Sequence, residues 1–264
     1  MKISVCITLK NRANFMRQKL DELRTMNFDP KQLEICVTDG NSTDGLKAVL
    51  QEKAKYFDQI KYAVSDRSKL PFKVPLNNPA CDINAQICNV ATYDKIIRTD
   101  AEVFFANKDS LKLIESHLRF RRHAISFIGY RMRQEFKRKS GVVPDQWKYA
   151  NSRDSFFCVG FDKRDFIALG GVEEAFARGY AAEDTYWHWY WHHVKWKLNY
   201  SPANHRVLHM WHGEEQLMKD GHELKHNYTL PMLRRFKKAW PKPNKDNPGW
   251  QRPEMISEVE IWKG

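Results

Sequence analysis

A chain of 264 residues is long enough for one large α/β domain with a substantial core. Its 44 Lys and Arg residues exceed its 32 Asp and Glu residues, and the formal net charge of +12 favours anionic partners: nucleic acid, an anionic membrane or a phosphorylated small molecule. The five cysteines are odd in number and include no C-x-x-C pair, which argues against a disulfide framework and a zinc site.

Hydrophobic stretches are short throughout the chain. The uncharged stretch at residues 3–9 is too short for the core of a signal peptide, and no apolar segment is long enough to span a bilayer. We therefore expect a cytoplasmic protein that makes at most a peripheral contact with an anionic membrane.

The first hundred residues alternate strand and helix patterns, which is typical of βαβ units and a largely parallel sheet. Apolar runs predict strands at residues 3–9, 33–39, 60–64 and 95–100. Leucine, isoleucine, valine and methionine at helical spacing predict helices at residues 12–26, from residue 46 onward, and from residue 83 to residue 90. Ligands bind at the carboxyl ends of strands in such sheets.

The second half of the chain is less regular. Residues 108–118 are predicted to be helical, whereas the basic segment 129–155 has no clear period. A strand, a short helix and a Gly-Gly turn are expected from residue 156, followed by an aromatic helix or loop at 185–197. We predict one domain over residues 1–240 and an irregular tail over residues 241–264.

Acidic residues follow two of the predicted strands. Asp39 lies in the turn of "VTDGNSTDG", where a carboxylate can accept hydrogen bonds from a base or ribose, although such loops are common. Asp100 and Glu102 in "TDAE" have i, i+2 spacing and would project the same way from an extended segment. They indicate either a cation site or a solvated strand end.

Two further patterns indicate chemistry. Glu183 and Asp184 precede a run of aromatic residues, and partial desolvation there would raise a carboxyl pKa toward that of a general base. His209 and His212 in "VLHMWHG" are spaced so that both can reach one metal ion, although such pairs are often structural.

Taken in order, these segments resemble the family 2 glycosyltransferases of the GT-A type. "ISVCITLKNR" is similar to the family's opening strand and Asn-Arg turn, "VTDGNSTD" to its nucleotide loop with Thr38 in place of the usual first Asp, and "INAQICNVATYDKIIRTDAEV" to the segment ending in D-x-D. "GGVEEAFARGYAAEDTYW" resembles the β-1,4-galactosyltransferase and bacterial chondroitin polymerase group. The resemblance implies a single GT-A, Rossmann-like α/β domain with a mixed, mostly parallel sheet. Residues 1–105 would form its nucleotide-sugar-binding half and residues 106–240 its acceptor-side half.

The resemblance also implies roles for single residues. It assigns the nucleotide sugar to Thr8, Asn11, Arg12, Asp39, Asn84, Arg98 and Asp100. It assigns a divalent cation, Mn²⁺ or Mg²⁺, to Glu102, His209 and His212, where Glu102 replaces the usual Asp and His209 replaces the Met of the galactosyltransferases. Asp184 would be the catalytic base, Glu183 would steady the acceptor, and Tyr180 and Trp187 would pack against the sugars.

The expected reaction is metal-dependent transfer of a sugar from a nucleotide-diphosphate sugar, with UDP as the favoured nucleotide, to an acceptor hydroxyl. A single base and in-line displacement imply inversion at the anomeric carbon. The expected acceptor is a glycan or lipid-linked glycan, because "LPMLRRFKKAW" at 230–240 has the pattern of an interfacial helix, although a helix packed on the domain would have the same pattern.

Other functions remain open. The basic surface also suits a glycosyltransferase that acts on a modified DNA base, or a non-catalytic protein that binds nucleic acid or membrane. A nucleotidyltransferase on the same kind of fold is a further alternative.

Overall fold

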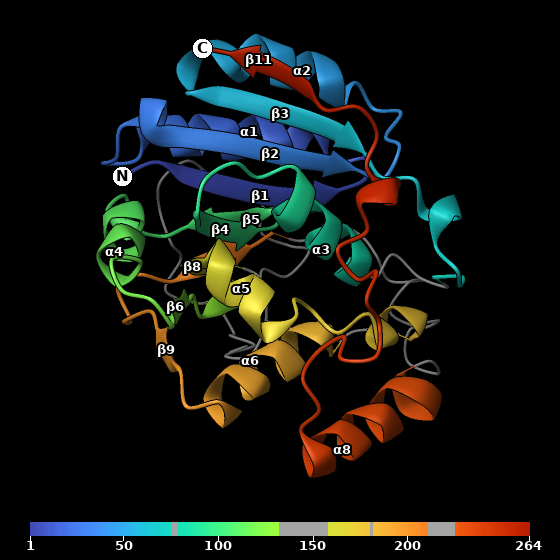
Figure 1. Cartoon of the computed structure of the whole chain (residues 1–264). Helices are drawn as coiled ribbons and strands as arrows, with labels where there is room; N and C mark the ends of the chain where they lie inside the picture. The colour runs from blue at the N-terminus through green and yellow to red at the C-terminus, as the bar shows by residue number, and fades with distance from the viewer. Residues whose placement is uncertain (75–78, 132–157, 180–181, 211–224) are drawn as a thin grey trace.

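The computed structural model describes residues 1–74, 79–131, 158–179, 182–210 and 225–264. Helices cover both faces of a large sheet, which gives a three-layer α/β arrangement (Figure 1). In spatial order, the strands of this sheet are β11 (Glu260–Lys263), β3 (Gln59–Val64), β2 (Leu33–Asp39), β1 (Ile3–Leu9), β4 (Lys95–Thr99), β8 (Cys158–Asp162), β6 (His123–Ser126) and β9 (Lys197–Tyr200).

The sheet is mixed, as predicted. Among the described strands, β3, β2, β1 and β4 pair in parallel, and β6 pairs in parallel with β9. The antiparallel pairs join β4 to β8, β8 to β6 and β11 to β3. The parallel part therefore comes from the first hundred residues, and the carboxyl ends of its strands meet at one edge.

Helices of two groups pack on the two faces of the sheet. One face is covered by α1 (Ala13–Thr25), α2 (Leu46–Lys53) and α4 (Ser110–His117). The other is covered by α3 (Ala80–Asn89), α5 (Lys163–Leu169), α6 (Glu183–His193) and α8 (Leu230–Ala239). A small second sheet contains β5 (Val103–Phe105), β10 (Val207–His209) and β7 (Gly129–Arg131).

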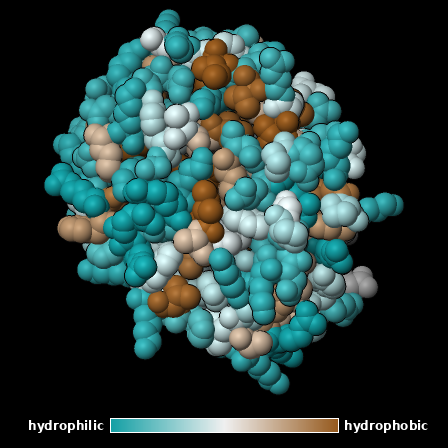
Figure 2. Space-filling view, in the orientation of Figure 1, coloured by the Kyte–Doolittle hydropathy of each residue, from teal (hydrophilic) through white to brown (hydrophobic). Residues whose placement is uncertain are grey.

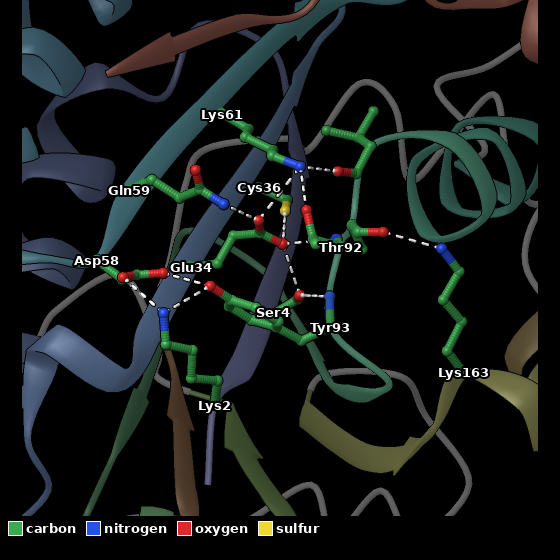
Figure 3. Close-up of polar contacts among 12 residues, drawn as sticks. Lys2, Ser4, Glu34, Cys36, Asp58, Gln59, Lys61, Thr92, Tyr93 and Lys163 are labelled. Carbon is green, nitrogen blue, oxygen red and sulfur yellow. Dashed lines mark hydrogen bonds and ion pairs between the residues drawn. The ribbon is translucent and has the colours of Figure 1, made fainter. Parts of the chain in front are cut away.

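The amino ends of the parallel strands are joined by a buried polar cluster around Glu34 (Figure 3). Its carboxylate accepts hydrogen bonds from the Ser4 hydroxyl (2.6 Å), the Thr92 amide (2.7 Å) and the Gln59 side-chain amide (2.5 Å), and it lies 3.3 Å from the Lys61 ammonium. The cluster ties β1, β2 and β3 to the residues that precede β4.

The aromatic stretch after residue 185 forms the helix α6, whose Trp187 and Trp191 are buried with ring centroids 4.7 Å apart. Helix α8 packs its apolar side on the same core: the ring of Phe236 contacts Phe176 and Tyr186. The basic side chains of α8 are exposed. For residues 230–240, the structure thus matches the packed-helix alternative.

The tail was expected to be irregular, but this is wrong for its last residues. Glu260–Lys263 form β11, which adds an antiparallel strand to the outer edge of β3. Within the described part of the chain, no helix has the length and apolar character needed to cross a membrane. The face shown in Figure 2 is mainly hydrophilic, with apolar residues in small groups.

Candidate functional site

A cleft of about 380 Å³ opens at the carboxyl ends of the parallel strands, the edge at which the sequence predicts a ligand. It brings together basic and acidic side chains from segments that lie far apart in the sequence. Its described lining residues are Thr8, Leu9, Lys10, Arg12, Thr38, Gly40, Ser65, Arg67, Pro79, Asp82, Arg98, Asp100 and Glu102.

The turn after β1 is held against the loop after β2. Asn11 adopts a left-handed conformation (φ 52°), and its side-chain oxygen accepts a hydrogen bond from the amide of Thr43 (2.9 Å). The Asn11 amide donates to the Ser42 hydroxyl (2.7 Å). Asn11 thus shapes the turn that presents Arg12 to the cleft, and its polar groups contact the loop.

Asp39 is not among the described residues that line the cleft, and its predicted contact with the nucleotide stays a prediction. Its two carboxylate oxygens accept hydrogen bonds from the Tyr62 hydroxyl (2.8 Å) and from the amide (2.9 Å) and hydroxyl of Ser42. Thr38 and Gly40, its neighbours, line the cleft instead. Successive residues of a strand point to opposite faces, so the side chains of Asp39 and Thr38 point to opposite faces of the sheet.

The segment after β4 places its acids at the cleft as predicted. The Arg98 guanidinium lies 2.5 Å from the Asp100 carboxylate and 3.5 Å from the Thr8 hydroxyl. Burial, and next the negative charge of Asp100, raise the pKa of Glu102 to about 7. A carboxylate in this environment, with a second carboxylate beside it, is suited to bind a cation.

His209 lies on the strand next to these acids. In the antiparallel pair of β10 and β5 it is opposite Val103, and the Met210 amide donates to the carbonyl of Glu102 (2.9 Å). The structure therefore brings the backbones of two predicted metal ligands, Glu102 and His209, together. The third, His212, lies outside the described residues, and no group of three potential ligands is found among the described ones.

Carboxylate oxygens from Asp100 and Glu102 fit a hard divalent cation such as Mn²⁺ or Mg²⁺. The neighbouring strand with His209 offers an imidazole that would favour Mn²⁺. The residues present thus fit the cation that the sequence predicts.

Sequence reasoning missed a second group of polar residues in the cleft. The Asp82 carboxylate in the first turn of α3 accepts hydrogen bonds from the Ser65 hydroxyl and from the Arg67 guanidinium, whose Nε is 3.1 Å away. Ser65 directly follows β3, so the rule that ligands bind at carboxyl strand ends could have identified it. Asp82 carried no comparable signal, because only the packing of α3 brings it to the cleft.

Asn84 and Trp187 are buried away from the cleft, and their predicted ligand contacts are corrected accordingly. The Asn84 side chain donates to the Val172 carbonyl (2.9 Å) and accepts from the Val172 amide (2.8 Å), which fixes the chain after the Gly-Gly turn. Trp187 is 1% exposed and packs on Phe161 and Trp191. Tyr180, the other predicted sugar contact, lies outside the described residues.

Glu183 and Asp184 begin helix α6 and are not among the described residues that line the cleft. The Asp184 carboxylate accepts a hydrogen bond from the Thr185 amide (2.6 Å) and is partly exposed. His188, one turn later, contacts the Asp184 carbonyl through Nδ1 and the Ser126 hydroxyl through Nε2, and so anchors this end of the helix. Asp184 as the catalytic base stays a prediction.

A family model matches the segment that contributes most strands of the parallel part of the sheet. The model of the family described as "Glycosyl transferase family 2" matches residues 4–71, a segment that includes β1, β2 and β3. No curated protein gives a significant match to the whole sequence. The match ends at residue 71, so the resemblance of the later segment to the galactosyltransferase and chondroitin polymerase group stays a prediction.

Solved structures show similarity over most of the chain. A mannosyltransferase from Pyrobaculum calidifontis, solved with GDP-Man and Mn²⁺, superposes with a TM-score of 0.56 at 15% identity, covering 96% of this chain and 69% of that one. Residues 1–349 of TarS from S. aureus, solved with UDP-GlcNAc, give 0.60 at 16% identity, covering 88% and 67%. The fold is that of GT-A glycosyltransferases.

The similarity to these solved structures confirms the predicted fold class. Against the longer TarS chain the coverage is 83% of this protein but only 38% of that one, with a TM-score of 0.57 and 16% identity. At such identities the likeness establishes the fold, and the reaction has to be inferred from the residues of the cleft.

Proposed function

We propose that this protein is a metal-dependent glycosyltransferase that transfers a sugar from a nucleoside-diphosphate sugar to an acceptor hydroxyl. The observation that supports this most directly is the composition of the cleft. Four basic side chains (Lys10, Arg12, Arg67 and Arg98) and three acidic ones (Asp82, Asp100 and Glu102) meet at the carboxyl ends of the strands.

Such a mixture of charges suits a nucleoside diphosphate bound together with a divalent cation. The arginines can bind phosphate oxygens, whereas Asp100 and Glu102 would hold Mn²⁺ or Mg²⁺. When bound, the cation would act as a Lewis acid that stabilises negative charge on the departing diphosphate.

The hydroxyl of Thr38 gives a second reason to place a polar ligand here. Thr38 lines the cleft, and its oxygen is buried without a hydrogen-bond partner within the described structure. A buried hydroxyl without a partner costs free energy, roughly 1–3 kcal/mol, which a ligand atom could recover. We therefore add Thr38 to the residues proposed to contact the nucleotide.

The chemistry requires one further group. As the acceptor hydroxyl attacks the anomeric carbon, it must lose its proton, and we assign this step to Asp184 with Glu183 beside it. One base and direct displacement of the diphosphate would invert the anomeric configuration. The favoured donor is a UDP-sugar, and the favoured acceptor is a glycan or lipid-linked glycan at an anionic membrane surface. A modified DNA base is the alternative acceptor.

Isothermal titration with UDP tests the proposal, with and without Mn²⁺. We expect micromolar to millimolar binding that requires the metal and that is lost in Asp100→Asn. Glu115→Gln, a change on α4 outside the described lining of the cleft, is the matched control. Transfer is then assayed with a panel of UDP- and GDP-sugars against lipid extracts and hydroxymethylated DNA. Metal-independent binding to DNA alone, with no nucleotide binding, would favour a non-catalytic nucleic-acid-binding protein.

A further inference from the structure

The end of the chain runs along the nucleotide side of the sheet. Figure 1 shows it passing the carboxyl ends of the strands near α3 before it forms β11 beside β3. We call residues 255–263 the C-terminal strap. Its register on β3 is fixed by the opposed pairs Glu260 with Tyr62 and Trp262 with Ile60.

The first part of the strap holds the backbone on both sides of Ser65, a lining residue of the cleft. The Asp66 amide donates to the Met255 carbonyl (2.8 Å), and the Ser257 amide donates to the Val64 carbonyl (3.0 Å). The Ser257 hydroxyl in turn accepts from the Val64 amide (2.7 Å). Met255 is completely buried. The strap thereby fixes the backbone at the end of β3, from which Ser65 and Arg67 reach Asp82.

The second part of the strap reaches the loop after β2 through aromatic packing. The ring of Trp262 stacks on Tyr62, with centroids 5.9 Å apart and planes 23° apart. The Tyr62 hydroxyl donates to Asp39, whose other oxygen accepts from Ser42. Ser42 accepts from the Asn11 amide, next to Arg12. A continuous chain of contacts thus leads from Trp262 to both loops of the cleft.

An ion pair supports the same side of the sheet. The Lys47 ammonium at the start of α2 lies 2.6 Å from the Glu260 carboxylate and 6.0 Å from the centre of the Tyr62 ring. Both groups are partly exposed, so this pair adds little stability by itself. It places the Lys47 ammonium beside the Tyr62 ring, between α2 and the strap.

We propose that the C-terminal strap is a positioning element of the nucleotide cleft, in which Trp262 and Ser257 hold the Asp39–Asp44 loop and the Ser65–Arg67 segment in the geometry that binds nucleotide. Neither side chain touches the ligand. Both side chains reduce the motion of the two cleft segments before the nucleotide binds. Without them, the nucleotide would have to order these segments itself, and this would weaken binding. The identity of the ligand in this inference rests on the proposed function. The ordering of the two cleft segments by the strap does not depend on it.

Four variants separate positioning from general stability. Trp262→Ala removes the ring that packs on Tyr62, and Trp262→Phe restores an aromatic ring. Ile261→Ala changes the preceding residue of the same strand, whose side chain is 50% exposed. Ser257→Ala tests the first part of the strap independently, through loss of the acceptor for the Val64 amide.

The primary readout is hydrogen–deuterium exchange of peptides covering residues 40–45 and 65–68, measured at least 20 °C below each variant's Tm. We expect faster exchange in both peptides for Trp262→Ala, faster exchange at 65–68 for Ser257→Ala, and wild-type exchange for Trp262→Phe and Ile261→Ala. The second readout is the Kd for UDP with Mn²⁺, which Trp262→Ala should raise roughly threefold to thirtyfold, the range of coupling through residues outside the ligand contact. Turnover at saturating donor should change by less than about twofold, since positioning of the nucleotide loops acts on binding.

Unchanged exchange in Trp262→Ala, or equal changes in Ile261→Ala, would overturn the positioning role. So would a lowered Tm with unchanged exchange and unchanged Kd, because the strap would then be a purely stabilising strand. If the wild type binds neither UDP nor GDP, the proposed function fails. The exchange data still decide whether the strap orders the two cleft segments.

Discussion

Replacing Glu34 should destabilise the protein more than replacing any exposed acidic residue. The reason is that the Glu34 carboxylate is the centre of the polar cluster in Figure 3. Glu34→Ala leaves the Thr92 amide and the Ser4 hydroxyl without their acceptor and removes the carboxylate next to Lys61. Loss of one partner from a buried charged network costs about 3–5 kcal/mol, a large share of a total stability of about 5–15 kcal/mol.

Glu34→Gln separates hydrogen bonding from charge. Its amide oxygen can still accept from Ser4 and Thr92, whereas its NH₂ group faces the NH₂ group of Gln59 and the Lys61 ammonium. We expect the free energy of unfolding to fall by about 1–3 kcal/mol, so that the stability of Glu34→Gln lies between the stabilities of the wild type and Glu34→Ala. Urea unfolding at pH 7 measures all three proteins, with the exposed Glu258→Gln as the matched control.

The pH dependence of the same variants tests the charge directly. Burial would raise the pKa of Glu34, but the hydrogen bonds from Ser4 and Thr92 and the ion pair with Lys61 outweigh it and lower the pKa below its usual value. A depressed folded-state pKa contributes stability above the unfolded pKa, and this contribution is lost as the pH falls through the folded value. The difference between wild type and Glu34→Gln should therefore shrink as pH falls below about 4.3. Equal stability of wild type and Glu34→Ala at pH 7, or a difference that grows on acidification, would refute the reasoning.

Three other predictions concern function. Asp184→Asn should fold and bind UDP normally but lose transfer by about a hundredfold or more, and near-normal transfer would exclude Asp184 as the base. Glu102→Ala should abolish metal-dependent UDP binding in calorimetry, whereas full wild-type activity in excess chelator would contradict the cation site. Four basic residues lie on the exposed side of α8: Arg234, Arg235, Lys237 and Lys238. Reversal of their charges should weaken binding to anionic vesicles or DNA in a salt-dependent way and leave UDP-sugar hydrolysis unchanged. If the salt dependence of binding is the same in the variant and the wild type, these residues only form a solvated surface.

Strands with strong local patterns could be predicted from the sequence. The runs at residues 3–9 and 33–39 form β1 and β2 with those bounds, because strands buried on both faces need an almost continuous apolar sequence. The short strand β11 has no such pattern. Its four residues alternate between exposed and partly buried, and only pairing with β3, some 200 positions earlier, gives it structure.

The direction of a side chain was harder to predict than its position in the sequence. Asp100 and Glu102 line the cleft, but the period of β2 turns Asp39 to the face opposite to that of Thr38, a lining residue. That period was present in the sequence: Cys36 and Thr38 alternate with Val37 and Asp39. Trp187 was misassigned because both sides of α6 are rich in aromatic residues and its period does not identify the buried side.

The charges of the cleft explain why a cation should be needed although the protein is strongly basic. Two arginines of the described lining are already paired with acids, Arg98 with Asp100 and Arg67 with Asp82. Their positive charge is largely compensated before a ligand binds, so a nucleoside diphosphate would add negative charge to a nearly balanced site. Lys10 and Arg12 can offset part of it. A divalent ion at Glu102 would offset the rest and would also remove the unfavourable interaction between the carboxylates of Glu102 and Asp100. The excess of positive charge therefore lies mainly outside the cleft, where it can act on an anionic acceptor or surface.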